Sequence, residues 1–136
     1  MRHLFSVLAA TIAASFALAM PAMAAETLSS GVTIEKLAQT KGAKPKASDT
    51  VRVHYRGTLI DDGREFDSSY KRGEPATFPL SRVIPCWTES MQTLRVGERA
   101  NILCPAATAY GARGIPGTIP PNSTLNFEVE LLAIEK

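Results

Sequence analysis

Hydrophobic and polar residues alternate along much of the chain after residue 30. Val51, Val53 and Tyr55 alternate with basic residues, and residues 125–131 alternate apolar with acidic or amide residues. Successive side chains of a β-strand point to opposite faces, so this alternation predicts half-buried strands. Shorter strand candidates are residues 31–37, 76–80 and 99–104.

One short helix is expected to begin at Pro85, because proline is favoured in the first turn of a helix. It cannot extend much beyond Gly97. Trp87, Met91 and Leu94 have the spacing that places side chains on one helical face. Together the patterns predict an α+β fold in which an antiparallel sheet of five to six strands wraps around one short helix.

The first 24 residues differ in character from the rest. A basic start precedes an apolar run over residues 4–20, and Pro21 and an Ala-x-Ala sequence follow. These are the features of a secretory signal peptide. A membrane anchor is the alternative, because about 17 apolar residues are close to the minimum that spans a bilayer. We therefore expect cleavage after Ala24.

The remaining chain is long enough for one domain. We expect residues 25–30 to form a short flexible tail and residues 31–136 to form the domain. The exported protein would reside in the periplasm or, alternatively, be secreted, with no membrane association after the signal is removed. A monomer is expected.

Charge is nearly balanced, with 15 Lys and Arg residues against 13 Asp and Glu residues. The densest basic run, Lys41, Lys44 and Lys46, is interrupted by glycine and proline. Nucleic-acid binding requires a more concentrated basic stripe, so no nucleic-acid partner is expected.

The chain has two cysteines, Cys86 and Cys104. Their spacing matches neither a C-x-x-C redox motif nor a zinc site, and His54 is the only histidine after the signal peptide. No metal or other cofactor is therefore expected. The two cysteines are either a disulfide, as export favours, or two buried free thiols.

Residues 109–122 contain three glycines and three prolines, so they form neither a regular helix nor a central strand. Their isoleucines and Tyr110 suit the wall of an apolar pocket with one polar hydroxyl. A surface loop that folds back on its own core is the alternative.

Six segments, in this order, resemble the FKBP-type peptidyl-prolyl cis-trans isomerases. They are Val53-His54-Tyr55-Arg56-Gly57, Phe66-Asp67-Ser68-Ser69, Val83-Ile84-x-x-Trp87, Val96-Gly97-Glu98-Arg99-Ala100, Ala109-Tyr110-Gly111, and Ile119-Pro120-Pro121-Asn122-Ser123-Thr124-Leu125 running into residues 127–132. The resemblance covers nearly all of residues 30–136. It implies a strongly twisted antiparallel sheet around a short helix, in agreement with the hydrophobic pattern.

The resemblance also implies a set of site residues. Those expected to be catalytic are Tyr55, Asp67 and Tyr110. Those expected to bind the substrate are Phe66, Arg72, Phe78, Val83, Ile84, Trp87, Ile119 and Phe127. Trp87 would be the apolar floor for a proline ring, and the backbone N–H of Ile84 and the hydroxyl of Tyr110 would donate to substrate carbonyls.

The implied activity is rotation of X-Pro bonds in folding exported proteins, by non-covalent stabilisation of the twisted amide in an apolar pocket. Partners would be proline-containing polypeptides, with macrolide immunosuppressants as inhibitors. The alternative is a non-catalytic, chaperone-like or peptide-binding module that uses the same pocket. An apolar clamp alone would not need Tyr55, Asp67 and Tyr110.

Three positions depart from the family pattern. Ala76 stands where some members have a pocket phenylalanine, and Ile115 stands at the loop tip where some have histidine. Cys86 stands where some have glycine. A Cys86–Cys104 bridge would connect the helix to a strand beneath it, directly behind the pocket floor. An activated Cys86 thiol at the helix start is a rival interpretation.

Overall fold

The computed structural model describes residues 24–136. The expected signal peptide, residues 1–24, lies outside this range except for its last residue. Among the described residues, no helix is long and apolar enough to cross a bilayer.

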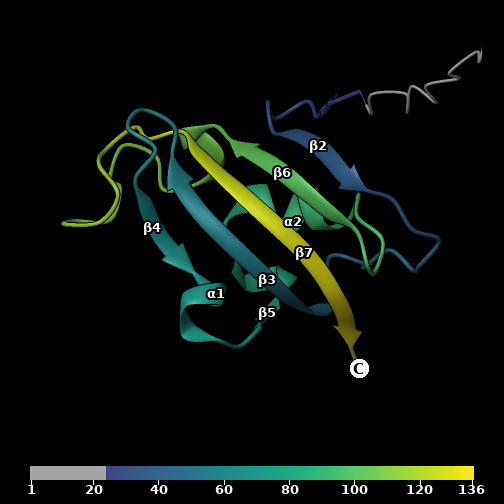
Figure 1. The fold of residues 1–136 in the computed structure, drawn as a ribbon. Helices are drawn as coiled ribbons and strands as arrows, with labels where there is room; N and C mark the ends of the chain where they lie inside the picture. Colours follow the sequence, from purple (N-terminus) through teal and green to yellow (C-terminus); the bar gives the residue numbers. More distant parts are fainter. Residues whose placement is uncertain (1–23) are drawn as a thin grey trace, which may run out of the picture.

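An antiparallel sheet dominates the fold (Figure 1). Its strands are β1 (Glu26–Thr27), β2 (Thr33–Ala38), β3 (Thr50–Leu59), β4 (Glu65–Ser68), β5 (Ala76–Pro79), β6 (Arg99–Cys104) and β7 (Leu125–Glu135). Their order across the sheet is β1-β2-β6-β7-β3-β4, and β5 also pairs with β3. The α+β class is confirmed, and the seventh strand beyond the expected five to six is accounted for by the two-residue β1.

The two long strands, β3 and β7, lie side by side in the middle of the sheet (Figure 1). Their alternating sequences place Val51, Val53 and Tyr55 in the core, together with every second residue of β7 from Leu125 to Leu131. The polar residues between them face outward, as period-two strands require. His54, one of these outward-facing residues, is nevertheless half-buried. Its Nδ1 lies 2.8 Å from the Ser69 hydroxyl, and its ring stacks on Tyr70.

Helix α2 (Pro85–Met91) lies behind the sheet in the view of Figure 1 and begins at the predicted proline. It ends earlier than Gly97, but Leu94 in the following turn is still fully buried. Trp87 and Met91 are buried as well, so the predicted apolar face packs against the sheet. A four-residue helix that the pattern did not predict, α1 (Ser69–Arg72), follows β4, and 3-10 turns occupy η1 (Leu80–Arg82) and η2 (Ala106–Thr108).

The flexible tail expected at residues 25–30 is not what the structure contains. Glu26 and Thr27 pair with Ile34 and Thr33 of β2. A turn follows, in which the Leu28 amide donates to the Val32 carbonyl at 2.8 Å. The Ser30 hydroxyl also donates to Glu89 of α2 at 2.5 Å, so this segment is attached to the domain.

A disulfide joins Cys86 of α2 to Cys104 at the end of β6, and both residues are fully buried. Their Cα atoms are 5.7 Å apart, within the usual range for a disulfide. Because Cys86 directly precedes Trp87, the bond ties the sheet to the segment of α2 that carries this tryptophan.

We expect the purified, oxidised protein to show no reactive thiol when it is denatured without reductant. Reduction should lower its free energy of unfolding by about 3 kcal/mol, because the bond closes a loop of 18 residues. Thiol titration in denaturant tests the bond, and chemical denaturation of the oxidised and reduced protein tests the energy. Two reactive thiols per chain in the unreduced protein would show that the cysteines are free.

Candidate active site

A cavity of about 430 Å³ opens between α2, the sheet and the loop that carries Tyr110. Its lining is mostly aromatic and aliphatic, with a few polar groups at its edge. The lining residues are Tyr55, Phe66, Asp67, Phe78, Arg82, Val83, Ile84, Trp87, Tyr110 and Phe127. This combination is typical of a small-molecule or peptide-binding pocket.

Trp87 forms the centre of an aromatic cluster at the base of the cavity. Its ring centroid lies 5.1 Å from that of Tyr55 and 5.2 Å from those of Phe78 and Phe127. All three pairs are edge-to-face, the arrangement that the quadrupoles of aromatic rings favour. With only 4% of its surface exposed, Trp87 is held in one orientation by these neighbours.

The walls of the cavity depend on Gly57 of β3. A Cβ atom at this position would lie 2.5 Å from Cζ of Phe66 and 2.9 Å from Cε1 of Phe127. These two rings therefore pack edge-to-face across the glycine, with their centroids 5.6 Å apart. Any larger residue would displace a wall of the cavity.

Tyr55 lies at the point along one edge of β3 where the neighbouring strand changes from β5 to β4. β5 pairs with β3 up to Val53, and β4 pairs with it from Arg56 onward. Between them, the buried hydroxyl of Ser69 in α1 accepts from the Tyr55 amide at 2.7 Å and lies 3.2 Å from its carbonyl. α1 thus replaces a strand partner and brings the end of β4 beside the Tyr55 side chain.

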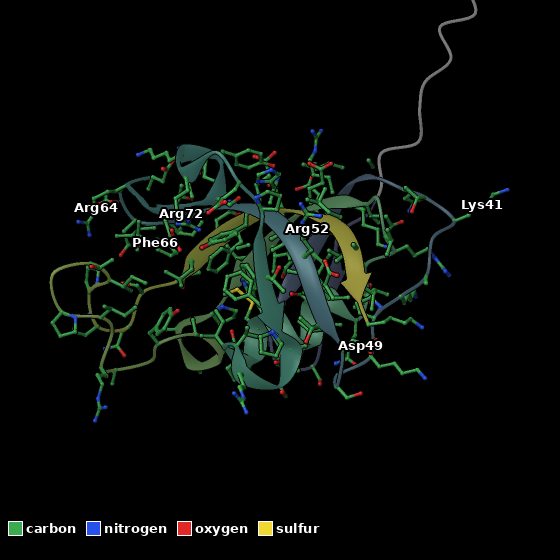
Figure 2. All side chains as sticks on the ribbon, turned by 90° about the horizontal axis from the view of Figure 1, so that it is seen from below. Lys41, Asp49, Arg52, Arg64, Phe66 and Arg72 are labelled. Carbon is green, nitrogen blue, oxygen red and sulfur yellow. A yellow bond between two sulfur atoms is a disulfide. The ribbon has the colours of Figure 1, made fainter. Side chains whose placement is uncertain are left out.

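A polar network of Tyr55, Asp67 and Arg72 lies at the edge of the cavity. The Tyr55 hydroxyl donates to Oδ2 of Asp67, and Nη1 of Arg72 donates to Oδ1 at 2.6 Å. Nη2 of Arg72 also donates to the Tyr55 oxygen at 2.9 Å. Figure 2 shows Arg72 and Phe66 on the same side of the molecule. Arg72 is not a lining residue, and its role here is to hold Asp67 and Tyr55 in place.

The network sets the charge state of the site. Burial alone would raise the pKa of Asp67, but hydrogen bonds from Tyr55 and Arg72 hold it below its ordinary value. Burial, and then the charge of Asp67, raise the pKa of Tyr110. Burial also raises the pKa of Tyr55. At neutral pH the site therefore presents one carboxylate and two protonated phenols.

Residues 41–132 match the sequence profile of the FKBP-type peptidyl-prolyl cis-trans isomerases. The chain belongs to this family. Residues 24–136 contain no cluster of three or more His, Cys, Asp or Glu side chains that could hold a metal ion.

Named proteins and a solved structure agree with this membership. The chain is 60% identical over 95 residues to the FKBP-type peptidyl-prolyl cis-trans isomerase FkpA of Aeromonas hydrophila. The aligned region covers 70% of this chain and 35% of that protein. It is 50% identical over 107 residues to FK506-binding protein 1 of Rhizopus delemar, covering 76% of this chain and 98% of that protein. The crystal structure of Escherichia coli FkpA matches with a TM-score of 0.77 and 50% identity, over 82% of this chain and 51% of that one. This chain thus spans about a third to a half of the FkpA proteins that it matches.

In this FKBP-type domain the structure brings nine of the residues implied by the resemblance into one cavity. The two others, Arg72 and Ile119, are not among the lining residues. Ile119 is 2% exposed, and its backbone pairs with Ile115 at the base of the loop. Ile115 was expected at the loop tip, but residues 116–118 form the tip instead.

The loop of residues 109–122 combines the two interpretations that its sequence allowed. Tyr110 lines the cavity, while most of the loop closes on itself through backbone hydrogen bonds, such as that from Asn122 to the Gly111 carbonyl at 2.8 Å. Gly114 has a φ of +58°, and a Cβ there would lie 2.3 Å from the Ile119 carbonyl oxygen. Glycine is thus required where the loop folds back.

Arg82, the last residue of η1, is the lining residue that the sequence reasoning missed. It belongs to none of the segments that carry the family resemblance. Its position directly before Val83 and Ile84 was the only available signal. Ala76 is half-buried and is not a lining residue.

Proposed function

We propose that this protein is a peptidyl-prolyl cis-trans isomerase whose active site is the aromatic cavity. The observation that carries the proposal is a single cavity with Trp87 as its floor and the Tyr55–Asp67–Arg72 network at its edge. Membership of the FKBP-type family supports it. The substrates would be proline-containing segments of folding polypeptides.

The reaction requires only that the twisted amide be bound more tightly than the planar one. Resonance gives the prolyl C–N bond partial double-bond character and a rotation barrier of about 20 kcal/mol. The twisted transition state loses this resonance, so its oxygen is less polar and its cost of leaving water is lower. The apolar walls therefore stabilise the transition state relative to the ground state.

Two donors can hold the peptide on either side of the rotating bond. The backbone N–H of Ile84, at the start of α2, donates to no acceptor within the described part of the chain. The raised pKa of Tyr110 keeps its hydroxyl protonated and able to donate at neutral pH. Hydrogen bonds to two substrate carbonyls would leave the proline ring packed on Trp87 while the rest of the chain turns.

We expect the purified protein to accelerate cis-trans exchange of X-Pro peptides, measured by NMR exchange spectroscopy. Tyr110→Phe keeps the ring but removes the donor, and should lower kcat/KM about three- to tenfold, the value of one neutral hydrogen bond. Tyr70→Phe is the matched control, because Tyr70 is exposed and outside the cavity. A folded protein that binds these peptides without accelerating exchange would favour the alternative, a peptide-binding module.

The cellular setting belongs to the same proposal. The signal-peptide pattern of residues 1–24 and the disulfide support export to the periplasm, where disulfides persist. We place the enzyme there as a monomer that acts on newly exported chains. Macrolide immunosuppressants would act as inhibitors by occupying the same cavity.

A further inference from the structure

Of the charged residues that the structure describes, only Asp67 and Arg82 line the cavity. The Asp67 carboxylate is already engaged: it pairs with Arg72 at 2.6 Å and accepts the Tyr55 hydroxyl. Its negative charge is therefore largely compensated from behind the cavity wall.

Arg82 has no such compensation. Its guanidinium forms no ion pair or hydrogen bond with any residue in the range 24–136, and the side chain is exposed at the end of η1. The next two residues, Val83 and Ile84, also line the cavity, and Ile84 carries the free backbone N–H proposed above to bind the substrate. A peptide held by that amide would pass close to an unpaired cation.

We propose that Arg82 is a specificity-determining residue, which selects prolines with an acidic side chain immediately before or after them. This inference rests on the proposed isomerase function of the cavity. An acidic side chain of the substrate would pair with the solvent-exposed guanidinium without displacing a protein carboxylate from it. A lysine in the same place would be repelled.

The size of the effect follows from the exposure of Arg82. A charge pair at a solvated rim changes affinity modestly, so we expect about a two- to fivefold preference for glutamate over glutamine. The preference should largely disappear at about 1 M salt, where the screening length is only about 3 Å. A preference that arose from side-chain shape would not respond to salt.

The test compares kcat/KM for two peptide series that carry Glu, Gln or Lys, one directly before and one directly after a proline. NMR exchange spectroscopy suits this comparison because it needs no protease that has its own preference. For the wild type, we expect Glu above Gln above Lys in at least one series. Arg82→Glu should reverse that order, and Arg82→Lys should keep it.

Lys41→Glu is the matched control, since it changes the net charge by the same amount. Lys41 lies on the opposite side of the molecule from Phe66 in Figure 2 and is not a lining residue. This variant should keep the wild-type order.

Equal rates for Glu, Gln and Lys in both series would overturn the role of Arg82 while leaving the isomerase function intact. An order that survives Arg82→Glu, or that Lys41→Glu reverses equally, would also overturn it. No catalysis of any peptide would contradict the proposed isomerase function instead. In that case chemical-shift titrations with the same peptides still decide whether binding follows the charge at Arg82.

Discussion

Replacing Glu98 with alanine should lower the free energy of unfolding by about 3 kcal/mol or more. Glu98 is only 1% exposed, yet it is fully partnered: its carboxylate accepts the amides of Thr40 at 3.0 Å and Arg95 at 2.8 Å, and Lys36 lies 3.1 Å away. These contacts connect β2, the loop after it and the turn before β6. Alanine would leave two backbone donors and an ammonium group without their acceptor. Urea unfolding measures the loss.

Glu128→Ala is the matched control for this prediction. Glu128 is also a carboxylate of the sheet, but it is 41% exposed and its nearest cation, Arg99, is 4.0 Å away. Its loss should change stability by no more than about 0.5 kcal/mol. Equal losses of unfolding free energy in the two variants would mean that the buried contacts of Glu98 contribute no more than those of an exposed carboxylate.

The same carboxylate should make stability depend on pH. Burial alone would raise the pKa of Glu98, but the Arg95 and Thr40 amides and the Lys36 ammonium group lower it below the ordinary value. A depressed pKa contributes stability above the unfolded-state value of about 4.3, and this contribution is lost as the pH falls through the folded-state value. Between about pH 5 and pH 3, the wild type should therefore lose more stability than Glu98→Ala.

Replacing Asp67 with alanine should lower kcat/KM for X-Pro peptides by about 10- to 100-fold, the range expected for losing hydrogen bonds to a charged group. Without the carboxylate, the Tyr55 hydroxyl and the Arg72 guanidinium lose their common acceptor, and only the hydrogen bond between them remains. Stability should change little, because the Asp67 side chain is 40% exposed. Exchange spectroscopy and urea unfolding of the same variant separate the two effects.

Glu65→Ala provides the comparison within the same strand. Glu65 pairs with Arg56 and Lys71 and is not among the cavity residues. It should retain activity within about twofold. If Asp67→Ala were as active as Glu65→Ala, Asp67 would have no part in catalysis, and the apolar cavity alone would account for the rate.

Much of the fold could be predicted because its strands obey a local rule. Residues 99–104 were predicted as a strand and form β6 with the same bounds, and α2 begins at Pro85 as expected. The period-two pattern succeeds in β3 and β7 because each has one face in the core and one in solvent. Residues 25–30 have no such pattern, and their pairing comes from β2, which offers them an open edge.

Part of the candidate site could likewise be predicted from the sequence, and part could not. Most of the aromatic residues could be named from sequence because they lie in segments that carry the family resemblance, and only Phe78 lies outside these segments. Arg72 was expected to bind the substrate, but it is not a lining residue, whereas Arg82 was not expected at the site and lies in the cavity lining. Which arginine takes which place depends on how α1 and η1 turn, and neither short element has a hydrophobic period to reveal it.

By itself, then, the sequence determined the strands, the start of the helix, the residues available to an apolar pocket and the family. Tertiary structure alone decided that Ser69 completes β3 beside Tyr55, that Ile119 is buried in its loop, and that Arg82 has no partner among residues 24–136. The physical reason is the separation along the chain of the residues that interact. Hydrophobic periodicity reports which face of a segment is buried, whereas the partner of a polar group is set by residues that are distant along the chain and adjacent only after folding.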